Sequence, residues 1–224
     1  MNSCMRYAAP ARFFKSLASA TLLMAAIFFT STGTQAAETF RILALGDSLT
    51  AGYGLEAADG FPGQLQKKLV AMGYSARVLN AGVSGDTSAG GLARLDWALA
   101  DRPTHAIIEL GANDGLRGLD PAAMRRNLNT IITRLRNAGI PVLLTGMRAP
   151  PNLGRTYETA FNRVFPELAE KHKVLFYPFF LSGVAARPEL NLDDGIHPNR
   201  DGVAVIVDRI VPYVVRLLEK RVRG

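Results

Sequence analysis

Residues 40–49 read Phe40-Arg41-Ile42-Leu43-Ala44-Leu45-Gly46-Asp47-Ser48-Leu49, an apolar run that ends in a polar turn. A short run rich in Ile and Leu that stops at Gly is typical of a buried strand. Ser48 then follows the carboxyl end of that strand, which is where open α/β sheets place their active sites. The stretch therefore predicts an α/β protein that carries a candidate nucleophile on a strand-end turn.

A base for that serine occurs far along the chain, in Asp194-Gly195-Ile196-His197-Pro198. A serine hydroxyl is a weak nucleophile at neutral pH and needs an adjacent base, which a third group orients. His197 is the candidate base and Asp194 the group that orients it. Asp193 is the alternative acid, at an offset of four residues instead of three. The non-catalytic alternative is that Ser48 is a turn or helix-cap residue and His197 a loop residue.

The other two histidines are weaker candidates. His105 lies at the edge of an apolar run and His172 lies in a charged stretch, and neither has a carboxylate three residues before it. We interpret both as structural or solvent-facing. His197 is therefore the general base that the sequence favours.

The first 36 residues have the pattern of a secretory signal peptide. Basic residues precede an apolar run at 17–29, small residues follow it, and the first acidic residue is Glu38. This pattern predicts cleavage after position 36 or 37, a mature domain at 37–224, and a periplasmic or secreted protein. An uncleaved membrane anchor is the alternative, although the apolar run is shorter than a usual span. A lipoprotein is disfavoured because Cys4 precedes the apolar run.

The net charge and the cysteine count argue against nucleic-acid binding and metal binding. The formal net charge is +7, and three of the 26 basic residues (Arg6, Arg12 and Lys15) lie in the leader, so 23 basic against 19 acidic residues leave +4. This excess is spread along the chain, with one small cluster at 220–223 that suits a helix end. We therefore expect no nucleic-acid partner. No Cys/His metal pattern occurs, and we expect neither a metal nor a cofactor.

Strands and helices are expected to alternate through one domain. Removing 36 leader residues from 224 leaves 188, which suits a single α/β domain. Alternation predicts a parallel sheet covered on both faces, as a three-layer α/β/α sandwich. Strands are expected at 40–45, 76–80, 104–110, 140–145 and 174–177. Helices are expected at 61–72, 88–99, 121–138, 156–172 and from just after His197. Pro212 should kink or split this last helix.

Two further glycine-rich segments follow expected strands, Gly82-Val83-Ser84-Gly85-Asp86 and Gly111-Ala112-Asn113-Asp114. Acyl transfer needs hydrogen-bond donors at the site where the tetrahedral oxyanion forms. Gly85 can offer a backbone N–H at close approach, Asn113 a side-chain amide, and Ser48 its own N–H. These three residues are the candidate oxyanion hole.

The four blocks together resemble the SGNH, or GDSL, hydrolase family, named for a Ser, a Gly, an Asn and a His. The resemblance runs from about Ile42 to the C-terminus and is closest to the bacterial branch of thioesterase I, lysophospholipase L1 and arylesterases. It implies a flavodoxin-like strand order and the roles given above to Ser48, Gly85, Asn113 and His197. Ala112 stands where this branch often has Gly.

The resemblance implies a small-molecule substrate: an aryl ester, a short or medium acyl ester, an acyl thioester or a lysophospholipid. Leu116, Pro150 and Tyr157 are the candidate substrate-binding residues, because their segments follow strands and should flank the cleft. A monomer is favoured. The alternatives are a carbohydrate O-deacetylase of the same fold and a secreted binding protein without turnover.

Overall fold

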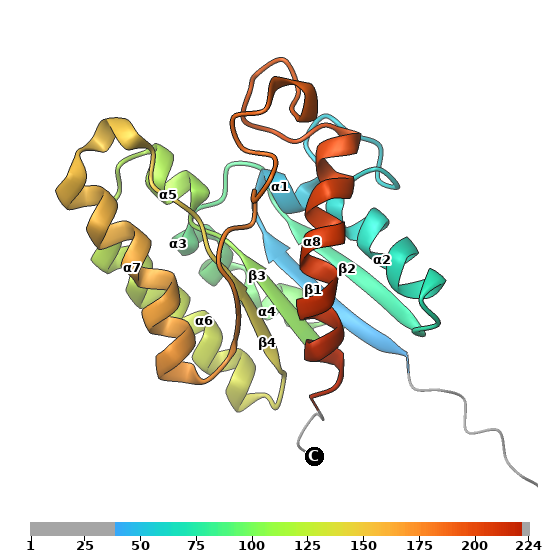
Figure 1. Ribbon diagram of the computed structural model, residues 1–224. Helices are drawn as coiled ribbons and strands as arrows, with labels where there is room; N and C mark the ends of the chain where they lie inside the picture. The colour runs from blue at the N-terminus through green and yellow to red at the C-terminus, as the bar shows by residue number, and fades with distance from the viewer. Residues whose placement is uncertain (1–38, 221–224) are drawn as a thin grey trace, which may run out of the picture. The chain divides into compact units, whose positions relative to one another are not determined.

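The computed structural model describes residues 39–220, and a five-stranded parallel sheet forms its centre. The strands stand in the order β2-β1-β3-β4-β5 (Figure 1). This is the flavodoxin-like order of a doubly wound sheet, so the expected fold class is confirmed. The strands are β1 (Phe40–Gly46), β2 (Ala76–Gly82), β3 (His105–Glu109), β4 (Val142–Thr145) and β5 (Leu175–Tyr177). The expected signal peptide lies outside the described residues.

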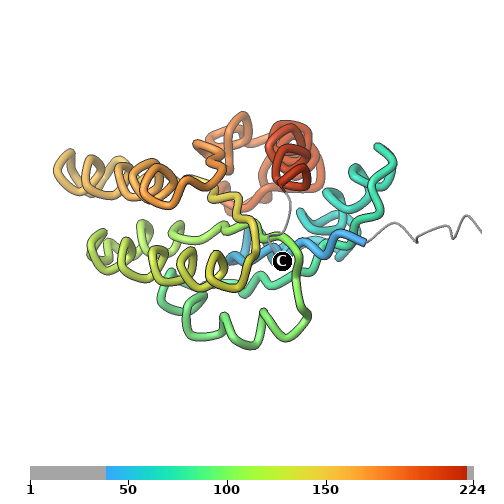
Figure 2. The backbone as a smooth tube through the Cα atoms, turned by 90° about the horizontal axis from the view of Figure 1, so that it is seen from below, coloured from blue at the N-terminus to red at the C-terminus, as the bar shows by residue number. Residues whose placement is uncertain are grey.

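Helices cover both faces of this sheet, which gives three layers. The helix α2 (Phe61–Ala71) packs against α8 (Arg200–Leu218) on one face (Figures 1 and 2). On the other face α3 (Ser88–Ala93) packs against α6 (Pro121–Asn137), and α6 packs against α7 (Arg155–His172). Every residue of β3 and β4 is buried, as expected for strands covered on both sides.

The expected helix at 88–99 is wrong in one respect, because it consists of two short helices. The helix α3 ends at Ala93. Its C-cap Arg94 has φ −103° and ψ 10°, and α4 (Leu95–Leu99) starts directly after this residue. Gly90 and Gly91 are poor helix formers, and the Arg94 side chain pairs with Asp86 rather than extending along a helix.

Of the two effects expected of Pro212, a kink or a split, the split does not occur. The helix α8 runs from Arg200 to Leu218 without being split at Pro212. Nine buried residues hold this helix against the sheet and α2, so packing outweighs the lost backbone hydrogen bond. Pro166 lies inside α7 in the same way.

Two helices were not anticipated: α1 (Ser48–Ala51) and α5 (Ala112–Leu116). Each has one turn, so neither shows a hydrophobic period in the sequence. Both start at the carboxyl ends of strands and carry candidate site residues. Two 3₁₀ turns complete the described elements, η1 (Pro151–Leu153) and η2 (Pro188–Leu190).

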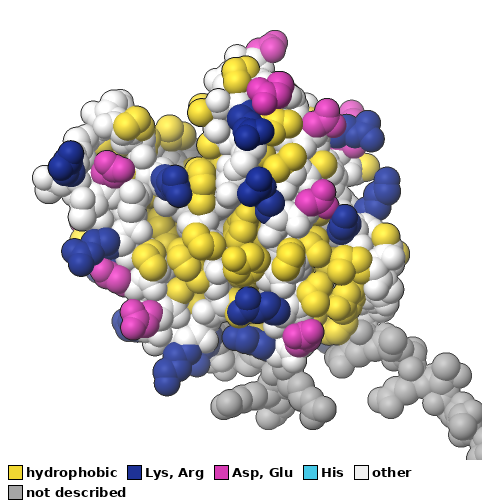
Figure 3. Space-filling view, in the orientation of Figure 1, with side chains coloured by type: hydrophobic (Ala, Val, Ile, Leu, Met, Phe, Trp, Pro, Cys, Tyr) yellow, Lys and Arg dark blue, Asp and Glu magenta, His cyan; other side chains and the backbone are white. Residues whose placement is uncertain are grey.

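The surface charge is mixed on the face that Figure 3 shows. Lys and Arg side chains there are interspersed with Asp and Glu instead of gathering in one patch. Within residues 39–220, no helix is long and apolar enough to cross a membrane.

Candidate active site

The candidate nucleophile sits at the first turn after β1. Gly46 ends this strand, and Ser48 is the first residue of α1. The side chain of Asp47 caps this helix, since its Oδ1 accepts a hydrogen bond from the N–H of Leu49 at 3.0 Å. The cap fixes the backbone direction at Ser48 and places the serine in the cavity described below.

His197 and Asp194 meet Ser48 in a continuous hydrogen-bonded line. The Nε2 atom of His197 lies 2.9 Å from Oγ of Ser48, and its Nδ1 lies 2.7 Å from Oδ2 of Asp194. The acid that contacts the imidazole is Asp194, whereas Asp193 lines a separate hollow with Arg187 and Leu192. The structure thus brings together the three residues that the sequence separates by up to 149 positions.

Asp194 is held by its own turn. Its Oδ1 accepts hydrogen bonds from the backbone N–H groups of Ile196 and His197, each at 3.0 Å. The His197 N–H, the His197 ring and the Ile196 N–H lower the pKa of Asp194 to about 2. This carboxyl is therefore ionised throughout the neutral range and faces the imidazole as an anion.

The ring of Tyr53 lies against the imidazole of His197. Their centroids are 4.4 Å apart with an interplanar angle of 32°. Tyr53 is half exposed, so it covers one side of His197 from solvent. Nothing in the sequence around Tyr53 pointed to this contact, because it depends on how the segment after α1 folds back over the 194–197 turn.

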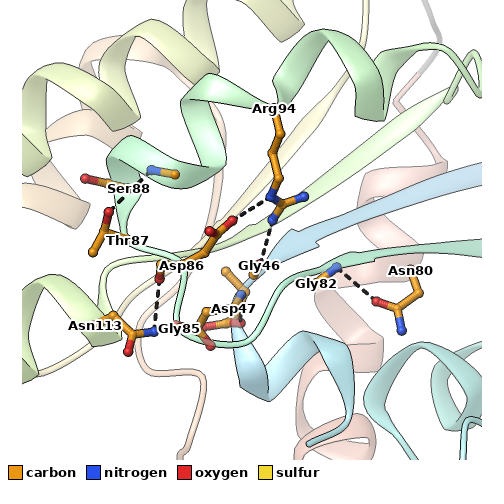
Figure 4. Close-up of polar contacts among 12 residues, drawn as sticks. Gly46, Asp47, Asn80, Gly82, Gly85, Asp86, Thr87, Ser88, Arg94 and Asn113 are labelled. Atoms are coloured by element: carbon orange, nitrogen blue, oxygen red, sulfur yellow. Dashed lines mark hydrogen bonds and ion pairs between the residues drawn. The ribbon is translucent and has the colours of Figure 1, made fainter.

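Gly85 lies on the turn after β2, which Arg94 fastens to the end of β1 (Figure 4). Nε of Arg94 lies 2.5 Å from Oδ2 of Asp86, and Nη2 donates to the carbonyl oxygen of Gly46 at 2.8 Å. Gly85 has φ +85°, a left-handed conformation that favours glycine. Arg94 was not anticipated, since a single arginine inside an expected helix carries no signal.

Asn113 points from α5 toward the same place. Its Nδ2 donates to the carbonyl oxygen of Asp86 at 2.9 Å and to Oδ2 of Asp47 at 3.2 Å. Asp114 fixes the helix from behind, because its carboxylate accepts from the N–H and the hydroxyl of Ser88 at 2.7 and 2.6 Å. Ser48, Gly85 and Asn113, the candidate oxyanion donors, all line one cavity.

That cavity has a volume of about 590 Å³ and is mainly apolar. Its lining includes Leu49, Leu116, Met147, Pro150, Phe179 and Leu181. Two of the three candidate substrate-binding residues, Leu116 and Pro150, therefore border it. One cation, Arg148, lines it too, with its guanidinium 4.7 Å from the centre of the Phe179 ring.

Tyr157 lies elsewhere, behind the 114–119 segment. Its hydroxyl donates to the carbonyl oxygen of Leu119 at 2.8 Å, and its ring stacks on Phe161. The structure therefore places Tyr157 as a support of the segment that carries Leu116 instead of in the cavity wall. Over the described part of the chain, no cluster of three His, Cys, Asp or Glu residues could hold a metal ion.

Comparison with known proteins places this geometry in a family. The model of the GDSL-like lipase/acylhydrolase family matches residues 44–205. Esterase TesA of Pseudomonas aeruginosa is 44% identical over 186 residues, which cover 83% of this chain and 92% of that protein. Thioesterase 1/protease 1/lysophospholipase L1 of Escherichia coli (strain K12) is 42% identical over 175 residues, 78% of this chain and 83% of that protein.

A solved structure agrees with these relatives. The crystal structure of the psychrotrophic esterase EstA from Pseudoalteromonas sp., inhibited by monoethylphosphonate, superposes with a TM-score of 0.76 at 36% identity. The match covers 80% of this chain and 99% of that one. The resemblance drawn from the four sequence blocks is thus confirmed, and the chain belongs to the GDSL-like lipase/acylhydrolase family.

Proposed function

We propose that this protein is an exported serine esterase that hydrolyses carboxylic esters through an acyl-enzyme on Ser48. The observation that carries the proposal is the line from Oγ of Ser48 through the imidazole of His197 to the carboxylate of Asp194, with contacts of 2.9 and 2.7 Å. This is the geometry that activates a serine. The names of two relatives, an esterase and a thioesterase/lysophospholipase, support ester and thioester chemistry.

Each residue has a defined task in this mechanism. His197 takes the proton of Ser48 as Oγ attacks the ester carbon, and then gives that proton to the leaving alcohol as the C–O bond breaks. Asp194 holds the imidazole with Nδ1–H toward itself and stabilises the imidazolium. A water molecule, deprotonated by His197, then attacks the acyl-enzyme, and the acid leaves as Ser48 regains its proton.

The oxyanion that forms in both steps needs donors, and we assign the backbone N–H groups of Ser48 and Gly85 and the Nδ2 of Asn113. The two hydrogens of this amide point at the carbonyl oxygen of Asp86 and at Asp47. The longer bond, at 3.2 Å to Asp47, is the one that a developing oxyanion would share, since such contacts tighten in the reacting complex. One donor of this kind is typically worth about 10²–10³ in rate.

The cavity favours a substrate with an apolar acyl or aryl group. Its walls at Leu116, Pro150 and Phe179 offer apolar surface next to Ser48. A carbohydrate deacetylase is less favoured, because the tryptophan Trp97 lies 70% exposed on α4 and does not line the cavity. We expect the protein to be a monomer that hydrolyses an ester, a thioester or a lysophospholipid without a cofactor.

The test is hydrolysis of p-nitrophenyl esters of increasing acyl length by the wild type and by Ser48→Ala. We expect the variant to lose at least about 10³-fold in kcat, as removal of a triad member does. A fluorophosphonate should label the wild type stoichiometrically at Ser48 and the variant not at all. A folded wild type that turns over no ester would leave a binding protein as the better interpretation.

A further inference from the structure

Two carboxyl groups are buried together beneath the candidate nucleophile. Asp47 is 0% exposed and Glu109 is 1% exposed. They meet because β1 and β3 pair in parallel with Gly46 opposite Glu109. A Cβ at Gly46 would lie 2.6 Å from Oε2 of Glu109, so the missing side chain of Gly46 provides the space that the Glu109 carboxyl uses. The triad described above does not use Glu109.

The hydrogen bonds around Glu109 indicate where a proton must be. Its Oε2 accepts from the hydroxyl of Thr50 at 2.8 Å and from the N–H of Asp47 at 3.3 Å. Among the described residues, the buried Oε1 has no hydrogen-bond partner. An ionised carboxylate with an unpartnered buried oxygen is costly. Two ionised carboxylates buried side by side would also repel each other, so one of them carries a proton.

The pattern places this proton on Oε1 of Glu109. Asp47 already accepts on both oxygens, from the N–H of Leu49 on Oδ1 and from Nδ2 of Asn113 on Oδ2. These contacts require an acceptor-only, ionised carboxylate. Oε2 of Glu109, with two donors directed at it, behaves as the carbonyl oxygen, which leaves Oε1, the oxygen that no donor reaches, as the hydroxyl.

The charges nearby support one shared negative charge instead of two. Arg94, which bonds to the end of β1, is paired with Asp86, and Arg117 bonds to the carbonyl oxygen of Gly85. Burial, and then the negative charge of Asp47, raise the pKa of Glu109 well above its ordinary value. His197 adds only a weak lowering to the pKa of Asp47. Like charges in such a site cannot both ionise at neutral pH.

We propose that Glu109 is a protonated positioning residue, which acts through Asp47 to orient both Ser48 and the amide of Asn113. The proposal rests on the function proposed above. Oε2 of Glu109 accepts from the N–H of Asp47, whose carboxylate caps the helix that begins at Ser48, so Glu109 holds the cap residue in place. The same carboxylate draws Nδ2 of Asn113 toward the site. With the amide reversed, its oxygen would face two acceptors, and the oxyanion would lose a donor.

The test compares Glu109→Gln, which keeps one donor and one acceptor without an ionisable proton, with Glu109→Leu, which keeps only the volume. We expect kcat for a p-nitrophenyl ester to stay within about threefold in Glu109→Gln. In Glu109→Leu we expect a fall of about 10-fold to 10²-fold, with KM changed less, because a misplaced catalytic group costs on that order. Thr145→Val is the control, since it removes another buried hydrogen bond beside β3 and should not change kcat.

Asp47→Asn supplies the opposite case. An amide offers one acceptor oxygen where the structure uses two, so kcat should fall in Asp47→Asn as it does in Glu109→Leu, whereas the equally conservative Glu109→Gln removes no charge and should be tolerated. Equal losses in Glu109→Gln and Glu109→Leu would show that Glu109 must be ionised, and full activity in a folded Glu109→Leu would show that it positions nothing. Either result overturns the proposal.

One readout does not depend on activity or on the folding of the leucine variant. The infrared difference spectrum between the wild type and Glu109→Gln at neutral pH should contain the C=O band of a protonated carboxylic acid. A carboxylate band in its place would overturn the proposal. A wild type without esterase activity would instead contradict the proposed function, so the two failures are distinguishable.

Discussion

Single residues set the chemistry of the site, and Asp194 is the clearest case. Its two oxygens are divided between backbone N–H groups and the imidazole. An asparagine there can satisfy the backbone through its oxygen only by turning its NH₂ group toward Nδ1, which favours the wrong imidazole tautomer. We expect Asp194→Asn to lower kcat by up to about 10⁴ while the fold is retained.

Asp193→Asn is the matched control, because it changes the neighbouring exposed carboxylate. It should leave kcat within about threefold. Steady-state kinetics with one aryl ester, together with circular dichroism, measure both variants. If Asp193→Asn were the more damaging change, the assignment of the orienting acid would be reversed.

Asp47 should make stability depend on pH. Burial raises its pKa to about 6 from an ordinary 3.8, although hydrogen bonds from Leu49 and Asn113 oppose the shift. Between these values the folded state binds the proton more strongly than the unfolded state, so stability falls as pH rises through this window. From pH 5 to pH 7.5 we expect a loss on the order of 1 kcal/mol from this group, since one pKa unit corresponds to roughly that much.

Urea unfolding at pH 5 and pH 7.5 checks this expectation, with Asp47→Asn as the comparison. The lowered pKa of His172 acts with the opposite sign, but it is common to both proteins. Asp194, with a folded pKa of about 2, contributes its own pH dependence below pH 4. The pH 5 advantage should shrink in the variant, and an unchanged difference would exclude Asp47 as its source.

The residues within sequence blocks could be predicted, and those that depend on strand register could not. Ser48, Asp194 and His197 stand in short motifs whose chemistry is legible from residue type and spacing. Glu109 reaches Asp47 only because Gly46 pairs with it across two strands. The spacing of residues along the chain does not predict the contact between Glu109 and Asp47.

At the scale of elements, Arg94 joins three of them. It interrupts the helical segment between α3 and α4, pairs with Asp86 after β2, and bonds to Gly46 at the end of β1. We expect Arg94→Gln to lower the free energy of unfolding by on the order of 3 kcal/mol, because it leaves a largely buried carboxylate unpaired. The loosened turn should also lower kcat by about 10-fold or more.

Lys68→Gln is the control for this variant, since it breaks the exposed ion pair with Asp208 and should cost less than about 1 kcal/mol. Urea unfolding and kcat are the measurements. The double variant Arg94→Gln/Asp86→Asn should recover part of the lost stability, because no unpaired charge remains. A double variant less stable than Arg94→Gln would contradict this account.

Long elements were predictable because they bury periodic stripes. The strands and the helices α2, α6, α7 and α8 all appear close to their expected positions. The one-turn helices α1 and α5 and the break at Arg94 were missed, since capping and side-chain pairing decide them and neither leaves a hydrophobic period.

For the whole molecule, we expect export and removal of the leader. In a Gram-negative host, active protein should appear in the periplasm or the medium, with an intact mass that starts at Ala37 or Glu38. The single cysteine, Cys4, would leave with the leader, so reductant should not change the unfolding midpoint of the mature enzyme. Full-length protein recovered from the membrane fraction would support an uncleaved anchor instead.

The separation of 149 residues between Ser48 and His197 has a consequence for biosynthesis. Translation proceeds from the N-terminus, so a growing chain contains its nucleophile and all three assigned oxyanion donors well before its base is made. Until residue 197 has emerged and α8 has packed behind it, the serine has no partner to accept its proton. We expect nascent chains that lack residue 197 to be inert toward esters, and hydrolytic competence to arise only once His197 has joined the fold.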